Sequence, residues 1–262
     1  MKTFYLTAFL AFSATIAFFS SCSYNPGSST PADTTHNSKL TFKQDYHAHY
    51  DLFVVDTADK NGNNPDNILT TTKIQLVDKV VDTGLSFHGK YPVVKIISYQ
   101  VNIATDSEYF YQDPNGDLYR YNFGFSILNK FTFLTQAIGS NIDVGWVLSA
   151  KITSPEGTSW IARNPDTVYL QSPNIPVILH SQGVMMADTS FLVGTEIVKA
   201  RHSRNTVTAT ALGIVENGSV IIDSYYSTAI NAIVEDFFRH VTLTGYFPQQ
   251  AQGKLKIMTS HD

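Results

Sequence analysis

The sequence predicts an all-β protein: a curled antiparallel sheet, as a sandwich or an open half-barrel, carried on a flexible N-terminal tether. Apolar and polar side chains alternate along several runs, beginning with residues 45–55, and a period of two is typical of half-buried strands. Turn-forming residues separate further runs at 113–117 and 217–218, as in β-hairpins. Charged residues make up 15% of the chain and apolar residues 43%, which argues against disorder and coiled coils.

The charge balance and the cysteine count exclude several classes of function. The 262 residues carry a formal net charge of −4 with 18 basic residues spread thinly, so nothing indicates a nucleic-acid partner. A single cysteine excludes a disulfide framework and a cysteine-based zinc site. The sequence has no phosphate-binding glycine loop, dinucleotide-binding motif or paired acid–base signature. We therefore expect no cofactor, and the sequence favours a non-enzymatic protein.

Residues 1–21 have the pattern of a secretory signal peptide. Lys2 supplies a positive charge, and residues 4–19 form an apolar run shorter than the roughly 20 residues of a permanent membrane-spanning helix. The run ends in Phe19-Ser20-Ser21-Cys22, which resembles a bacterial lipobox with Phe19 in place of the usual aliphatic residue. The resemblance implies that the Cys22 thiol takes a diacylglycerol group. Several acyl chains together anchor a protein stably in a membrane.

The segment after this cysteine predicts a tether and a location. Residues 22–40 are rich in Ser, Thr, Pro, Gly and Asn, which is the composition of a flexible linker. No acidic cluster follows Cys22, and by resemblance to Gram-negative lipoproteins this implies the outer membrane, facing the periplasm. Residues 41–262 are then expected to form a β-rich domain, as one unit or as two halves joined near 154–176.

Strands are predicted from alternation along the first half of the domain. In residues 45–55 the side chains at even positions, from Tyr46 to Val54, share one face of a strand. Further strand-like runs occupy 70–82, 92–103 and 107–112.

Two hairpins are predicted from turn sequences. Residues 107–123 are expected to turn at Asp113–Asp117, and residues 206–226 at Asn217-Gly218. The prolines between 131 and 180 fit edge strands and connections, because proline cannot donate a ladder hydrogen bond.

The segment 227–239 is compatible with two structures. Its apolar residues recur at helical spacing behind Ser227, a residue type favoured at helix N-caps. However, IDSYYSTAINAIVEDFFRH at 222–240 resembles the ending of poorly characterised lipoproteins of Bacteroidota and Chlorobi. In that ending an aromatic-rich strand turns through a short glycine-bearing loop into another strand, and here Asn231 and Ala232 replace the glycines. The resemblance implies an envelope lipoprotein with a curved antiparallel domain, and we expect a strand over 232–243.

His47 and His49 are the candidate metal ligands. On a strand they point to the same face as Asp45 and Asp51, and a His-x-His pair can supply two ligands of a zinc site. A third ligand has to come from elsewhere in the chain. The same pattern fits a solvated polar face, which is the better interpretation, so no metal site is expected.

Two further motifs are similar to functional sequences without meeting their requirements. Leu179-His180-Ser181-Gln182-Gly183 resembles the nucleophile elbow of α/β-hydrolases, but Leu179 replaces the first glycine. We expect Ser181-Gln182-Gly183 to form a turn between strands, with Ser181 inactive. Residues 59–63 and 113–117 carry alternating oxygen ligands as calcium loops do; the first lacks the closing glutamate, and Pro and Gly explain the second as a turn.

The many Tyr and Phe residues between 109 and 125 fit strand core and cross-strand pairs, or an aromatic surface that binds carbohydrate or lipid. The leading hypothesis is a non-enzymatic cell-envelope lipoprotein, held to the membrane by its lipid, that binds a partner protein, a glycan or a lipid. One alternative is a lipid carrier with an apolar cavity, lined by Phe, Ile and Leu, inside a half-barrel. The other is a hydrolase or metal-dependent enzyme, which requires histidines and carboxylates converging in a pocket.

Overall fold

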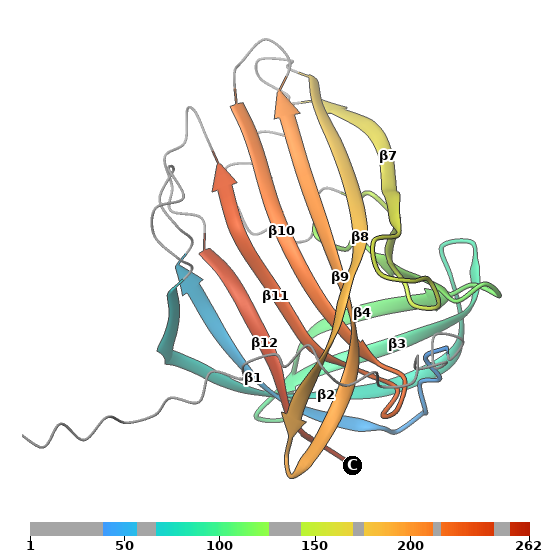
Figure 1. Cartoon of the computed structure of the whole chain (residues 1–262), viewed down its shortest axis with the longest axis vertical. Helices are drawn as coiled ribbons and strands as arrows, with labels where there is room; N and C mark the ends of the chain where they lie inside the picture. The colour runs from blue at the N-terminus through green and yellow to red at the C-terminus, as the bar shows by residue number, and fades with distance from the viewer. Residues whose placement is uncertain (1–38, 57–66, 126–142, 170–175, 212–215, 244–251) are drawn as a thin grey trace, which may run out of the picture. The chain divides into compact units, whose positions relative to one another are not determined.

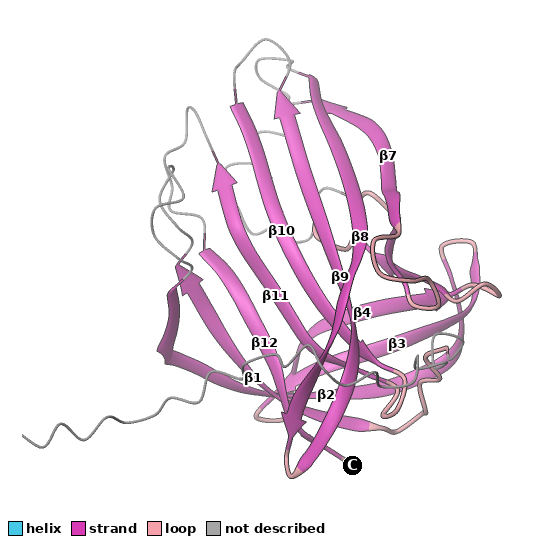
Figure 2. Cartoon of the chain, in the orientation of Figure 1, coloured by secondary structure: helices cyan, strands magenta, loops and turns pink. Residues whose placement is uncertain are grey.

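The computed structural model describes residues 39–56, 67–125, 143–169, 176–211, 216–243 and 252–262, all within one compact unit of the chain. The regular structure of these residues is entirely strand (Figure 2). The strands are β1 (His47–Asp56), β2 (Asn67–Phe87), β3 (Lys90–Gln100), β4 (Ile103–Gln112), β5 (Asp117–Tyr121), β6 (Trp146–Lys151), β7 (Ser159–Tyr169), β8 (Pro176–Val193), β9 (Glu196–Ala211), β10 (Glu216–Ser227), β11 (Ala232–Leu243) and β12 (Gln252–His261). The expected signal peptide, Cys22 and most of the tether lie outside the described residues. The described part of the chain contains no helix with the length and apolar character needed to cross a membrane.

The strands form one antiparallel sheet in the order β6-β5-β4-β3-β2-β1-β12-β11-β10-β9-β8-β7 (Figure 1). Strands adjacent in the sequence pair with each other, except that β1 pairs with β12 in the middle and that β6 and β7 form the two edges. In Figure 1, β2–β4 run across behind β8–β11, because the sheet curls until its two halves face each other around a shared core. The predicted all-β class and curled antiparallel sheet are confirmed.

Side chains on the inner face of the sheet form the main hydrophobic core. Its largest fully buried members come from both halves of the sheet: Phe110, Leu118, Phe125, Ile152, Leu179, Met185, Ile222 and Tyr226. Full burial of an apolar side chain of this size contributes about 1.5–3 kcal/mol. The packing of one half of the sheet on the other is therefore a main source of stability.

Edge strand β6 closes the curl by packing against β7, β8 and β9. Its carbonyl groups accept hydrogen bonds from side chains in place of a neighbouring strand. Trp160 Nε1 donates to the Leu148 carbonyl at 2.8 Å. Ser203 Oγ and Asn205 Nδ2 both donate to the Ser149 carbonyl, at 3.0 and 2.8 Å. Because unpaired sheet edges are templates for aggregation, this covering of β6 protects the fold.

The predicted alternation along β1 holds only for the first part of the strand. Ala48 and Tyr50 are buried as expected, but the pairing with β2 shifts register between Leu52 and Val54. Between these two positions β1 advances from Leu52 to Val54 while β2 runs from Ile74 to Leu69, so the ladder is irregular there and the simple alternation of faces is lost. Val55 is buried in place of Val54, which corrects the predicted face.

Both predicted hairpins exist, but one turns at a different place. Strands β4 and β5 are joined as expected, and Asp113 Oδ1 accepts from the backbone N–H groups of Asn115 and Asp117 at 2.8 and 3.0 Å. The second hairpin is formed by β9 and β10, whose connection is 212–215, and the expected turn residues at 217–218 belong to β10. The observed register places Val207 opposite Val220, and both are buried. Cross-strand packing over a long ladder thus outweighs the local turn motif.

The segment over 232–243 is a strand as predicted, and the helical interpretation is wrong. The turn before it ends at Asn231, whose φ is 53°. Asparagine tolerates this left-handed conformation better than most residues, which explains how the turn forms without the usual glycine. The apolar residues at helical spacing instead lie on both faces of β11, where Val234 and Phe238 are buried and Phe237 is half-buried.

Two predictions on the middle of the chain have different outcomes. Pro155 lies in a connection, Pro165 in edge strand β7, and Pro176 is the first residue of β8, as predicted for proline. The turn expected at 181–183 does not exist, because these residues lie inside β8. Gly183 fits a strand there because the Trp160 indole packs onto its backbone.

We expect Gly183→Ala to destabilise the protein by about 1–3 kcal/mol, the usual cost of overpacking a core. A Cβ at this position would lie 2.3 Å from two carbons of the Trp160 indole, which is itself buried and hydrogen-bonded. Denaturant unfolding measures the effect. Gly84→Ala is the matched control, since a Cβ on that β2 glycine meets nothing closer than 4.0 Å. Equal unfolding midpoints for the two variants would contradict the packing.

Candidate functional site

The candidate metal ligands lie on β1 without a completed site. His47 Nδ1 is 3.6 Å from an Asp262 carboxylate oxygen. Asp45 and Asp51, expected near the histidines, each form an ion pair with a lysine of β2. Among the described residues there is no group of three or more His, Cys, Asp or Glu side chains that could hold a metal ion.

Ser181 lies in the interior of β8. Its side chain is fully buried, and Oγ has no hydrogen-bond partner among the described residues. A serine nucleophile needs a base within hydrogen-bond reach and access to substrate. Neither is present at Ser181 in the described part of the chain, so the hydroxyl is placed in the core and not at a reactive elbow.

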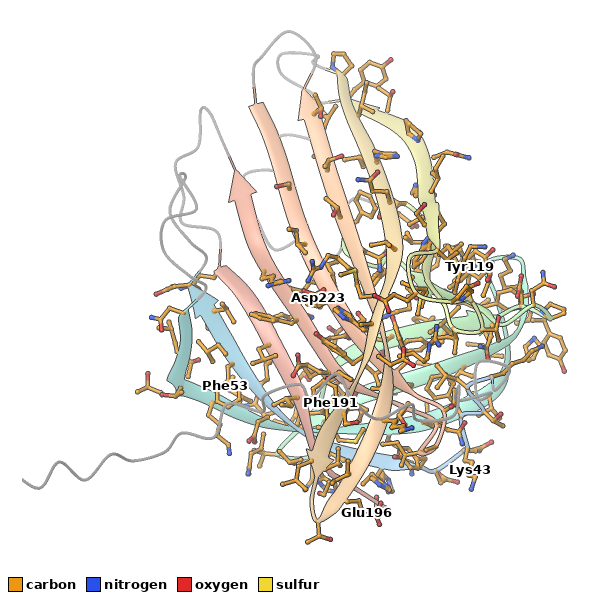
Figure 3. All side chains as sticks on the ribbon, in the orientation of Figure 1. Lys43, Phe53, Tyr119, Phe191, Glu196 and Asp223 are labelled. Carbon is orange, nitrogen blue, oxygen red and sulfur yellow. The ribbon has the colours of Figure 1, made fainter. Side chains whose placement is uncertain are left out.

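Six half-buried aromatic side chains gather on the outer surface of β2–β6: Phe87, Tyr109, Tyr111, Tyr119, Tyr121 and Trp146. We call this set the aromatic face; Figure 3 labels Tyr119 within it. Phe87 stacks on Tyr109 with ring centroids 4.0 Å apart. Trp146 meets Tyr121 edge-on at 5.4 Å. Because strand residues alternate, Phe110 between two of these tyrosines points into the core instead.

Polar contacts hold the aromatic face in place. Trp146 Nε1 donates to the His88 carbonyl at 3.0 Å, and the Tyr121 hydroxyl donates to Asp143 Oδ2 at 2.9 Å. Burial and this hydrogen bond raise the pKa of Tyr121 to about 12, so the hydroxyl stays protonated. Lys90 Nζ sits 4.7 Å from the centroid of Tyr111. These contacts orient Trp146 and Tyr121 and place a cation beside Tyr111 in the protein without ligand.

Two hollows border the aromatic face. The first, which we call the β7 groove, has a volume of about 350 Å³ and lies between Trp146 and the residues of β7 from Ile161 to Asp166. Arg163 and Asp166 form an ion pair in it at 2.8 Å, and Asn164 also lines it. Planar polar side chains beside an indole ring form the wall of this groove.

The second, which we call the β4 hollow, has a volume of about 300 Å³ and lies where the β4–β5 ladder ends at Phe110 and Arg120. Phe87, Tyr109 and Tyr121 of the aromatic face line one side of it. Charged side chains line the other side: Glu108, Arg120 and Lys254. The β4 hollow therefore has rings of the aromatic face on one side and charged side chains on the other.

A buried ion pair underlies the β4 hollow. The Arg120 guanidinium donates to both carboxylate oxygens of Asp236, at 3.0 and 2.8 Å, and to Glu108 Oε1 at 2.9 Å. It also lies over the Phe123 ring, 4.3 Å from the centroid. Burial raises the pKa of Glu108, but Arg120 and two lysines outweigh it and lower the pKa to about 2. Glu108 is therefore ionised at neutral pH.

A separate charged cluster surrounds Asp223, labelled in Figure 3. His202 Nε2 lies 2.7 Å from Asp223 Oδ1, Arg204 Nε donates to the same oxygen at 2.8 Å, and Arg239 is paired with Oδ2 at 2.6 Å. Burial opposes ionisation of Asp223, but His202 and the two arginines outweigh it and lower its pKa. Burial and nearby carboxylates raise the pKa of Glu235 on β11 to about 7.

We expect this Glu235 to make the protein less stable as pH rises from about 4.5 to about 7. The unfolded chain releases the proton near the usual 4.5, whereas the folded protein holds it until about 7, so folding is favoured below that window. Glu235→Gln removes the titration. Its free energy of unfolding should therefore depend less on pH than that of the wild type, and an unchanged pH dependence would contradict the assignment.

The sequence did not identify Arg120, Glu108 and Asp236 as a cluster. Arg120 and Asp236 lie 116 positions apart, and only the curl of the sheet brings them together. The sequence contained a partial signal. Arg120 lies between Tyr119 and Tyr121 in a strand, so its side chain points to the face opposite the two tyrosines. Either the arginine is buried and the tyrosines face outward, or the reverse.

Comparisons with known proteins give similarity in structure only. No family model matches the chain, and no curated protein matches it. It is similar to a candidate lipoprotein from Parabacteroides distasonis, with 8% identity and a TM-score of 0.44 over 86% of this chain and 97% of that one. It is also similar to a candidate exported protein with a YmcC-like fold from Bacteroides fragilis, with 7% identity and a TM-score of 0.36 over 86% and 99% of the chains. The hypothetical lipoprotein YmcC from Escherichia coli shares 9% identity, with a TM-score of 0.33 over 83% and 88%.

Proposed function

We propose that the protein is a non-enzymatic cell-envelope lipoprotein, anchored at the outer membrane through Cys22 and facing the periplasm, that binds a glycan on the aromatic face. The observation that carries the proposal is the aromatic face itself. Its six rings lie together on the outside of the sheet, Trp146 and Tyr121 are held by hydrogen bonds, and the β7 groove and the β4 hollow flank the set.

A glycan fits the aromatic face because a sugar ring has both an apolar face and a polar edge. The C–H groups of a pyranose form an apolar face that stacks on aromatic rings, and its hydroxyls need polar partners at the ring edge. The β7 groove offers Arg163, Asn164 and Asp166 beside Trp146. Binding sites combine such apolar walls with a few polar groups that fix orientation.

The same hollows give the lipid-carrier alternative less support. That alternative requires a cavity lined by Phe, Ile and Leu, whereas ionised Glu108 and Arg120 line the β4 hollow. Placing an acyl chain against these side chains would remove water from charges without providing a polar partner, which is costly.

The proposed tether, residues 22–40, is consistent with a domain that binds a ligand near the membrane to which it is anchored. We propose residues 23–38, which separate the anchor from the first described residues, as a flexible linker; a linker of this length spans roughly 20–25 Å on average. The Thr41 N–H donates to Asn231 Oδ1 at 2.7 Å, so the chain is attached to the sheet soon after the tether.

Calorimetric titration of the detergent-solubilised lipoprotein tests the proposal. The probes are cellotetraose, N-acetylchitotetraose and maltotetraose, which differ in linkage and substituents. We expect at least one to bind and Trp146→Ala to weaken it by about two- to tenfold, since an aromatic contact is worth roughly 0.5–1.5 kcal/mol. Tyr169→Ala is the control: this tyrosine of β7 is 56% exposed and lies outside the aromatic face. No binding to any probe, or equal losses in the two variants, would refute the proposal.

A further inference from the structure

We infer that the β4 hollow selects glycans that carry a free amino group, and that Glu108 accepts a hydrogen bond from the ammonium. The inference deepens the proposed function and rests on it. It follows from one unsatisfied oxygen atom, from the charges around that atom, and from the position of the hollow beside the aromatic face.

Glu108 has one carboxylate oxygen that lacks a donor. Arg120 donates to Oε1 at 2.9 Å, but Oε2 is buried and has no hydrogen-bond partner among the described residues. The neighbouring buried carboxylates are better supplied. Asp236 accepts from Arg120 and Ser224, and Asp78 accepts from Ser98 and Lys256. A buried acceptor without a donor is costly, so of these three carboxylates Glu108 gains most from a further hydrogen-bond donor.

The charges favour a cationic donor over a neutral hydroxyl. Among the described residues, the hollow and the buried cluster beside it carry four carboxylates and three cations, namely Asp78, Glu108, Asp236 and the exposed Asp106 with Arg120, Lys254 and Lys256. Asp78 is paired with Lys256, and Asp236 with Arg120. Asp106 and Glu108 therefore face Lys254 with one negative charge in excess, which an ammonium group neutralises.

The shape and walls of the hollow fit a single amino sugar. Its volume of about 300 Å³ is at the lower end for small-molecule sites, so it takes one sugar unit and not a folded chain. Phe87, Tyr109 and Tyr121 line the side next to the aromatic face, and aromatic rings attract cations. A glycan stacked on the aromatic face can thus place the amine of one unit beside Glu108.

Two tetrasaccharides that differ only in acetylation test the inference. We compare the glucosamine tetramer with N-acetylchitotetraose by calorimetry on the detergent-solubilised lipoprotein. At about pH 6 the free amines are largely protonated and Glu108, with a pKa of about 2, is ionised. We expect the glucosamine tetramer to bind roughly tenfold more tightly or better, because a hydrogen bond between charged groups is stronger than a neutral one.

Variants assign the preference to Glu108. Glu108→Gln keeps the shape and an acceptor for Arg120 but removes the charge, so the two ligands should bind equally. Asp106→Asn, at an exposed position, lowers the excess negative charge without touching Arg120, and we expect it to reduce the preference severalfold. Glu235→Gln, which alters a glutamate outside the hollow, is the control and should keep the preference.

The outcomes separate the inference from the proposed function. Equal binding of both tetramers to the wild type overturns the amine inference and leaves glycan binding standing. No binding of these tetramers or of the neutral probes refutes both. A preference that survives in Glu108→Gln and in Asp106→Asn shows that the amine binds elsewhere, and it also overturns the assignment.

Discussion

Asp236→Ala is expected to lower the free energy of unfolding by about 3–5 kcal/mol, the cost of leaving a buried charge without its partner. The Arg120 side chain is only 4% exposed, and Asp236 takes two of its hydrogen bonds. Without Asp236, Glu108 is the one ionic partner that the guanidinium keeps among the described residues. Ser224 also loses the carboxylate to which its hydroxyl donates. Denaturant unfolding followed by circular dichroism measures the change.

Lys151→Ala is the matched control for this experiment. It breaks the ion pair between Lys151 and Asp117, at 3.1 Å on the partly exposed surface of β5 and β6. Such pairs contribute about 0–1 kcal/mol, because water screens both charges. If Asp236→Ala and Lys151→Ala lower the free energy of unfolding equally, the pair of Arg120 and Asp236 contributes no more to stability than a surface ion pair, which contradicts the prediction.

Cys22→Ala is expected to move the protein from the membrane fraction to the soluble fraction, or to leave it as an unprocessed precursor. Acyl chains on this cysteine are the only membrane attachment that the sequence predicts after the signal peptide is removed. Fractionation of cells with immunodetection, together with metabolic labelling by palmitate, measures the change. The label should disappear in Cys22→Ala.

Ser21→Ala is the control for anchoring, because it keeps a small residue before the cysteine and should leave labelling and sedimentation unchanged. Mature Cys22→Ala protein that still sediments with membranes would show that another feature holds it there. In that case the lipid anchor would be removed from the proposed function.

Local patterns in the sequence were sufficient to predict most strands. Alternation predicted β1 and most of β2 to β4, although the expected run 92–103 crosses the turn at Val101 and Asn102; the Asp113–Asp117 turn predicted the β4–β5 hairpin. The helical spacing of apolar residues over 227–239 does not by itself distinguish a helix from a strand, because a strand with apolar residues on both faces has the same spacing. These features depend on residues close in the chain, and one sequence contains enough information for them.

Features that depend on distant residues could not be predicted in the same way. The β9–β10 register is set by packing of Val207 on Val220 and not by the turn motif. Gly183 lies in a strand because Trp160, from another strand, occupies the space beside it. The aromatic face was foreseen only as one use of the tyrosines, since its assembly from β2, β4, β5 and β6 requires the sheet order.

The measurement that tests the central claim most directly is tryptophan fluorescence during titration with the tightest-binding tetrasaccharide. The chain has two tryptophans; Trp146 belongs to the aromatic face, and Trp160 is buried against Gly183. We predict a saturable change in emission with the same Kd as calorimetry. Trp146→Phe should keep most of the binding, because the aromatic ring is retained, but lose the change in emission. Binding without any change in Trp146 emission, or a change that persists in Trp146→Phe, would contradict glycan binding on the aromatic face.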